Sequence, residues 1–191
     1  MLLSTNLLTS VIMKGIVFVG FFELVEKEFG YEMEDRLIEE CDLKSEGIYT
    51  AVGTYEHNEM VKLVTKLSEH SGLSVPVLLK TYAQYFGKAH LRKYSAFYDN
   101  AEDTFAFLES IDGHIHVEVK KLYPDAELPR FTSSRPSENT LELIYSSVRK
   151  MSAFAEGLIQ DTALYYGEEI DIAQTLLEAD GSKVKFTITK R

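Results

Sequence analysis

The stretch DGHIHVEVKKLYPDAELP, residues 112–129, divides the chain into two parts with different sequence patterns. Before it, apolar residues recur every three or four positions, which is typical of amphipathic helices. Pro124 ends this pattern, because the residue before a proline is disfavoured in helical backbone. From Pro129 onwards the chain contains short runs rich in strand-forming residues. The stretch therefore predicts an α+β fold in which a helical part precedes a sheet.

The helical part is expected over residues 13–124, with helix ends marked by glycine and proline. Gly30 closes a first apolar period that starts at Met13, and Gly72 closes the third. Ser74 is a candidate N-cap with Pro76 in the first turn, and Asp103 is a candidate cap further on. Helices are expected over 13–29, 32–41, 56–70, 74–94 and 103–108, and the stretch that follows, up to Tyr123, is also expected to be helical.

The second part, over residues 129–191, is expected to have a ββαββ order. The motif RPSEN connects a first pair of runs, and ADGS connects a second pair, so each pair predicts a hairpin. A helix is expected from Ser152 to Gly167 between the hairpins. Together the runs predict an antiparallel four-stranded sheet over 130–134, 140–148, 170–178 and 183–189.

Composition limits the classes of function. The chain has 191 residues and a net charge of −10, which suits one domain and disfavours nucleic acid or an anionic membrane as a partner. No run approaches the about 18 apolar residues that span a bilayer, and residues 1–12 are a poor signal peptide and a leader of uncertain status. We therefore expect a cytoplasmic protein whose single domain occupies residues 13–191.

Metal ligands are few. Cys41 is the one cysteine, so neither an internal disulfide nor a multi-cysteine zinc site is expected, and it is interpreted as a small buried hydrophobe. His114 and His116 lie two residues apart, and on a helix they point to different sides and cannot chelate one metal together. Either is compatible with an ordinary surface or core histidine. As a metal site, one single axial ligand is favoured over a chelating pair.

The stretch LELIYSSVRK, residues 141–150, places three polar groups in one row if it is a strand. Tyr145, Ser147 and Arg149 then share a face and offer a phenol, a hydroxyl and a guanidinium fork. Such a row suits an anionic group, because the fork binds a carboxylate through two hydrogen bonds. A solvated strand face with Arg149 paired to a surface acid is an equally good reading.

Taken together, these stretches resemble a known signature. His116, twelve residues, Pro129, fifteen residues, and then Tyr145-x-Ser147-x-Arg149 is similar to the signature of the H-NOX family of haem-nitric oxide/oxygen binding domains. The stretches MKGIVFVGF (13–21), YFGKAH (85–90) and YYGEEIDI (165–172) also resemble segments of that family. The resemblance extends over nearly the whole chain from Met13.

The resemblance implies one non-covalently bound haem b per chain, buried between the helical part and the sheet. His116 would be the axial ligand of the haem iron, and His114 a bystander. Tyr145, Ser147 and Arg149 would hold the two haem propionates. Pro129 would press on the macrocycle and distort it. The resemblance gives no reason to expect zinc, because the cysteines that bind it in some members are missing here.

The resemblance also bears on gas selectivity. In oxygen-binding members a tyrosine nine residues after the motif tyrosine donates a hydrogen bond to oxygen, and here that position is Phe154. Leu158 and Phe86 would add apolar lining. A hydrogen bond to a charge-bearing group contributes about 1.5–3 kcal/mol, so an apolar pocket favours nitric oxide, tolerates carbon monoxide and binds oxygen weakly.

Other tyrosines leave the selectivity open. The positions near Gly20 that could assist a distal tyrosine are Phe21 and Phe22. Tyr82 and Tyr85 lie on a helix that could face the haem, and either could supply the missing donor.

The function implied is a sensor and not an enzyme. Nitric oxide would release His116 from the iron, and the signal would pass to a separate protein, in related bacterial systems a histidine kinase or a cyclic-di-GMP enzyme. Three alternatives remain: a sensor of oxygen or carbon monoxide, a haem enzyme that handles nitric oxide or peroxide, and an α+β ligand-binding domain without haem. An enzyme would favour a distal histidine or arginine in residues 151–166, which contain neither.

Overall fold

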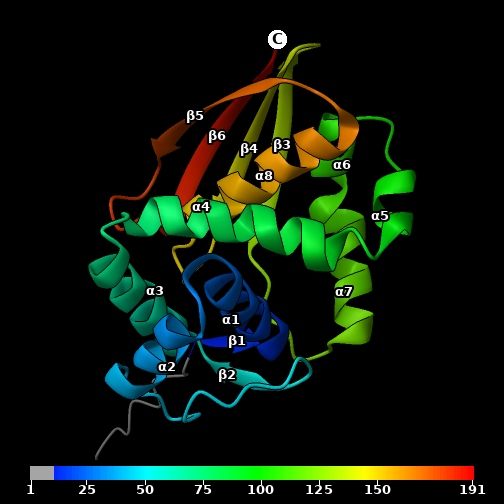
Figure 1. The fold of residues 1–191 in the computed structure, drawn as a ribbon. Helices are drawn as coiled ribbons and strands as arrows, with labels where there is room; N and C mark the ends of the chain where they lie inside the picture. The colour runs from blue at the N-terminus through cyan, green and yellow to red at the C-terminus, as the bar shows by residue number, and fades with distance from the viewer. Residues whose placement is uncertain (1–10) are drawn as a thin grey trace, which may run out of the picture.

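The computed structural model describes residues 11–191, so residues 1–10 of the leader lie outside the described residues. The chain has an α+β fold with a four-stranded antiparallel sheet, as the sequence predicts (Figure 1). A small two-stranded sheet that the sequence analysis does not predict accompanies it. Ile12 already belongs to strand β1 (Ile12–Lys14), which pairs antiparallel with β2 (Thr54–Glu56).

The helix predicted over 13–29 is confirmed except at its start, where Met13 and Lys14 belong to a strand. Met13 pairs with Tyr55 across the two short strands, and helix α1 (Gly15–Phe29) begins two residues later. A Cβ at Gly15 would come within 1.9 Å of the backbone oxygen of Thr50, so only glycine permits this close approach. An apolar residue at position 13 fits both the helical pattern and the alternating pattern of a strand. Pairing with a strand some forty residues away decides for the strand.

The next helices lie close to their predicted ranges. They are α2 (Tyr31–Glu40), α3 (His57–Ser71) and α4 (Val75–Phe86). Gly72 ends α3 in the left-handed conformation, as the sequence predicts. Ser74 occupies the N-cap position, but it uses its backbone carbonyl, which accepts from the amide of Leu78, and its side chain makes no cap hydrogen bond.

The helix predicted as far as Tyr94 is divided. A π-helical turn, η1 (Gly87–Leu91), follows α4, and a short helix α5 (Ser95–Asp99) follows after it. Helix α6 (Thr104–Ser110) begins at Asp103, whose Oδ1 accepts from the amide of Ala106 at 2.7 Å. A second π-helical turn, η2 (Ile111–Ile115), leads into α7 (His116–Leu122), which ends before Pro124.

The sheet has the strand order β3-β4-β6-β5, and all of its pairs are antiparallel. Its strands are β3 (Arg130–Ser137), β4 (Thr140–Ser146), β5 (Ile170–Leu176) and β6 (Lys183–Lys190). β3 extends further than predicted, through Pro136, because it is an edge strand with an irregular register between Ser134 and Ser137. β4 is shorter than predicted and ends at Ser146.

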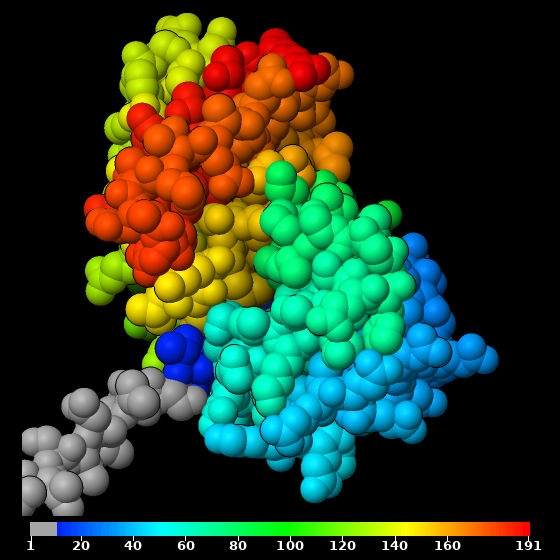
Figure 2. All heavy atoms as spheres, turned by 90° about the vertical axis from the view of Figure 1, so that its left-hand side faces the viewer, coloured from blue at the N-terminus to red at the C-terminus, as the bar shows by residue number. Residues whose placement is uncertain are grey.

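Helix α8 (Ser152–Tyr166) joins two hydrophobic cores. Phe154 and Leu158 pack against the core formed by α1 to α4, whereas Ala155 and Ile159 belong to the core between α8, α6 and the sheet. Figure 2 shows the helical part in blue to green and the sheet part, residues 130–191, in yellow-green to red. Cys41 is buried in the first core, as predicted. In the part of the chain that the structure describes, no helix is long and apolar enough to cross a membrane.

Helices α4 and α8 cross in close contact at Gly157. A Cβ at this position would come within 2.5 Å of the backbone oxygen of Lys80 and 2.7 Å of the Cβ of Ala83. We predict that Gly157→Ala lowers the free energy of unfolding by about 1–3 kcal/mol, because the two backbones must separate. Urea denaturation measures this change. Gly113→Ala is the control, since its Cβ would meet no atom within 4 Å, and equal losses in both variants would contradict the prediction.

The buried ring of His57 makes the stability depend on pH. Its Nε2 has no hydrogen-bond partner within residues 11–191, and burial together with the charge of Arg149 lowers the pKa of His57 from 6.5 to about 4. Because the unfolded chain binds this proton first, stability is lost as the pH falls from about 6.5 towards 4, by up to about 3 kcal/mol. Urea denaturation across this range should show a shallower pH dependence for His57→Gln. The exposed His114→Gln is the control, and parallel pH profiles for wild type and His57→Gln would refute the assignment.

Candidate functional site

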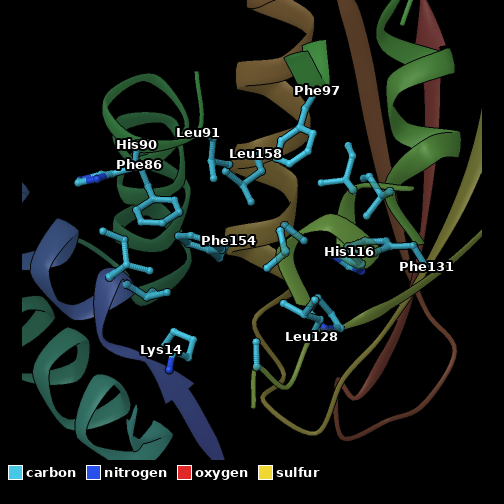
Figure 3. Close-up of a pocket in the computed structure, with 18 of the residues that line it drawn as sticks. Lys14, Phe86, His90, Leu91, Phe97, His116, Leu128, Phe131, Phe154 and Leu158 are labelled. Atoms are coloured by element: carbon cyan, nitrogen blue, oxygen red, sulfur yellow. The ribbon is translucent and has the colours of Figure 1, made fainter. Parts of the chain in front are cut away.

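A cavity of about 440 Å³ lies between the helical part and the sheet. Its volume falls within the roughly 300–1,000 Å³ typical of ligand pockets. Most of the lining side chains are apolar, and they come from both parts of the chain (Figure 3). Of the eight site residues that the sequence predicts, the wall includes seven: Phe86, His116, Pro129, Tyr145, Arg149, Phe154 and Leu158.

His116 is the first residue of α7, and its ring lies at the cavity wall. Its Nδ1 lies 3.1 Å from Oδ1 of Asp112, which also accepts from the amide of Phe131 at 3.2 Å. The carboxylate therefore favours the tautomer with the proton on Nδ1 and leaves Nε2 with a lone pair. Burial lowers the pKa of His116, although Asp112 opposes this, so the ring is neutral at neutral pH. His114 is exposed and is not part of the cavity wall.

The predicted row of polar groups on one strand face is wrong in its geometry. The strand ends at Ser146, and Val148 and Arg149 form a turn in which the Oγ of Ser147 accepts from the amide of Arg149 at 3.2 Å. Ser147 is not part of the cavity wall. The turn nevertheless brings Arg149 to the same wall as Tyr145, whose hydroxyl accepts from the amide of Met151 at 3.0 Å.

The guanidinium of Arg149 ties three segments together. Nη1 donates to the carbonyl of Ile12 at 2.9 Å, and Nη2 donates to the carbonyl of Glu127 at 2.5 Å. The carboxylate of Glu127 is more distant, at 3.9 Å from Nη1. The alternative reading of a solvated arginine paired to a surface acid therefore does not describe this buried side chain, which is 9% exposed.

Lys14 also lines the cavity, and the sequence reasoning missed it. Its Nζ donates to the carbonyl of Val52 and to Oγ1 of Thr54, both at 2.8 Å, and forms an ion pair with Asp125 at 3.2 Å. No periodic pattern marks Lys14, because the sequence predicts a helix, and not the three-residue strand β1, at this position. With Lys93 and Arg149 it gives the cavity wall three cations in an acidic protein.

The wall around Phe154 is apolar. The rings of Phe86 and Phe154 lie 6.0 Å apart between centroids, and Leu158 follows one turn later on α8. Figure 3 shows these side chains pointing into the cavity across from His116. Their phenyl and isobutyl groups offer no hydrogen-bond donor.

The tyrosines that could have supplied a donor are bonded elsewhere. The hydroxyl of Tyr82 donates to the carbonyl of Val17, and that of Tyr85 lies 3.4 Å from Oε2 of Glu23. Neither residue belongs to the cavity wall, and the same is true of Phe21 and Phe22, which pack in the first core.

His90 is a polar residue of the wall that the sequence reasoning missed. It lies in η1, and its Nε2 is 2.7 Å from Oε2 of Glu23 on α1. Its ring stacks on Phe86 with centroids 5.1 Å apart. Within residues 11–191, no group of three or more histidine, cysteine, aspartate or glutamate side chains could hold a metal ion.

Comparisons with known proteins show what the chain is similar to. The family model of haem-NO-binding domains matches residues 14–174. An Fe(II) unliganded H-NOX protein from K. algicida is 42% identical, with a TM-score of 0.90 over 94% of this chain and 97% of that chain. The H-NOX from Shewanella woodyi, solved in the Fe(II)CO state with IWP-051 bound, is 43% identical, with a TM-score of 0.79 over 94% and 95%.

A more distant structure shares the fold. The H-NOX protein from S. oneidensis in the Fe(II)NO state is 24% identical, with a TM-score of 0.86 over 94% of this chain and 99% of that chain. No curated protein matches the chain. Since the family model covers most of the sequence, the chain belongs to the haem-NO-binding, or H-NOX, family of haem-based gas sensors.

Proposed function

We propose that this protein is a haem-based sensor of nitric oxide that signals to a separate partner protein. The main support is the position of His116 relative to the apolar wall of the cavity. His116 presents an imidazole with a free Nε2 to an apolar cavity, and the wall across from it, at Phe154 and Leu158, has no hydrogen-bond donor.

The cavity residues fit one haem b per chain. The apolar walls suit the macrocycle, His116 offers an axial nitrogen, and Arg149 with Tyr145 offers cationic and phenolic groups to the propionates. The two backbone carbonyls occupy two of the five N–H donors of Arg149, so others remain for a carboxylate. Bound haem would supply a ferrous iron that binds a diatomic gas.

Ser147 and Pro129 have different proposed roles, one in holding a turn and the other in contacting the macrocycle. Ser147 holds the turn that presents Arg149, because its Oγ accepts from the Arg149 amide. Pro129 lines the cavity, and its fixed φ makes it a rigid wedge against the macrocycle.

The absence of a donor around Phe154 supports nitric oxide as the ligand. Oxygen bound to ferrous iron gains about 1.5–3 kcal/mol from a donor, roughly ten- to a hundredfold in affinity, and nitric oxide needs this help far less. We therefore propose binding of nitric oxide and carbon monoxide with weak or no binding of oxygen.

The contacts of α7 support release of His116 as the signal. The helix ends at Leu122, and Asp125, three residues beyond it, bonds to Lys14 and Thr54 of the small sheet. A helix freed at His116 can therefore move β1 and β2 through these bonds, which gives two states with different contacts. The proposed receiver is a histidine kinase or a cyclic-di-GMP enzyme.

The geometry of His90 favours a sensor over a peroxide-handling enzyme. Such an enzyme needs an acid–base group directed at the iron side of the cavity. The Nε2 of His90 instead bonds to Glu23.

The first test compares absorption spectra of the reduced protein without gas, in air and with nitric oxide. We expect a haem spectrum that nitric oxide shifts and that air leaves unchanged before slow oxidation. In His116→Gly, added free imidazole should restore the haem spectrum. Nitric oxide should then release this imidazole from the protein, and the released imidazole is measured after dialysis. His114→Gly is the control. Haem binding by His116→Gly without imidazole, with an unaltered spectrum, would contradict the role of His116.

A second test restores a donor to the apolar wall. Phe154→Tyr is expected to raise oxygen affinity by about ten- to a hundredfold, because its hydroxyl can donate to oxygen. Gas titration followed by absorption measures the affinity, and Phe154→Leu serves as the apolar control. A stable oxygen complex in the wild type would show that another donor already reaches the ligand.

A further inference from the structure

His90 lies at the cavity wall but directs its polar edge away from the cavity. Figure 3 shows Phe86 pointing towards Phe154, while the ring of His90, on the π-helical turn that follows Phe86, points away. Residue 90 is 9% exposed, so its ring is enclosed by protein. A π-helical turn often occurs at functional sites, since it changes the direction in which a helix presents its side chains.

Two features of α1 hold the ring in this position. The carboxylate of Glu23 lies 2.7 Å from Nε2 of His90 and 3.4 Å from the hydroxyl of Tyr85, so it accepts from both. Gly20, one turn earlier, leaves room for the imidazole. A Cβ at Gly20 would lie 3.2 Å from Nε2 of His90 and 2.9 Å from Cδ2 of Phe86.

We propose that Glu23 and Gly20 hold His90 in a retracted position and thereby withhold a hydrogen-bond donor from the gas-binding side of the cavity. This inference rests on the proposed function and names a positioning residue, Glu23, that sets the selectivity against oxygen. Histidine has a donor that could reach a diatomic ligand after rotation about Cα–Cβ, a change between staggered rotamers.

The balance between the two positions depends on the Glu23 bond. A carboxylate is a stronger acceptor than a diatomic gas, because a charged partner shortens and strengthens the hydrogen bond. While Glu23 is present, the ring gains more by pointing outwards. Removing this carboxylate leaves the imidazole without its partner and makes the inward rotamer competitive.

The test uses the haem-loaded protein and Glu23→Leu. The C–O stretching frequency of the carbon monoxide complex is read by infrared spectroscopy, because a nearby donor lowers this frequency. We expect a band at lower frequency in Glu23→Leu that is absent in the wild type, and an oxygen affinity raised about ten- to a hundredfold. The double variant Glu23→Leu/His90→Leu should return both readings to wild-type values. Glu28→Leu, another exposed carboxylate of α1, is the matched control.

The outcomes separate this inference from the proposed function. An unchanged C–O frequency and oxygen affinity in Glu23→Leu, with a wild type that binds nitric oxide but not oxygen, would overturn the inference alone. A shifted C–O band in the wild-type protein that His90→Leu removes would show that the ring already points inwards, and would also overturn it. A wild type that binds oxygen stably would overturn the inference together with the proposed selectivity.

Discussion

The buried guanidinium of Arg149 holds together the segments between which the cavity lies. It bonds to the carbonyl of Ile12 in β1 and to that of Glu127 in the connection between α7 and β3. A buried cation is costly unless hydrogen bonds satisfy it, and these carbonyls provide them. Since Ile12 lies 137 residues away along the chain, this one side chain connects the start of the described fold to the sheet. The same side chain lines the cavity, so the proposed contact with the haem propionates and the packing of these segments involve one group.

Helix α8 is the second constraint. It packs apolar side chains on two opposite sides, against the helical core and against the sheet, and it crosses α4 so closely at Gly157 that a methyl group does not fit. The cavity is therefore bordered by side chains that two cores hold in place. A wall of this kind keeps Phe154 and Leu158 in fixed positions, which the proposed selectivity through the lack of a donor requires.

Much of the site could be predicted from local sequence, and the exceptions have physical causes. Helical spacing shows only that His114 and His116 cannot chelate one metal together, and the resemblance to the H-NOX signature selects His116 and places Phe154 and Leu158 at the wall. The row of Tyr145, Ser147 and Arg149 is wrong as a strand face because the strand ends in a turn after Ser146. The alternation of residues that predicts a strand does not show where the strand ends, so it cannot predict that turn.

The sequence by itself determined the α+β class, the order of the sheet-forming runs, and the caps at Asp103 and Gly72. These properties depend on periodicity and turn chemistry, which act over a few residues. Only the tertiary structure decided that Met13 pairs with Tyr55 and that His90 bonds to Glu23. His90 and Glu23 are 67 residues apart in the sequence. Their contact depends on how α1 packs against the end of α4, and a local sequence pattern cannot predict that packing.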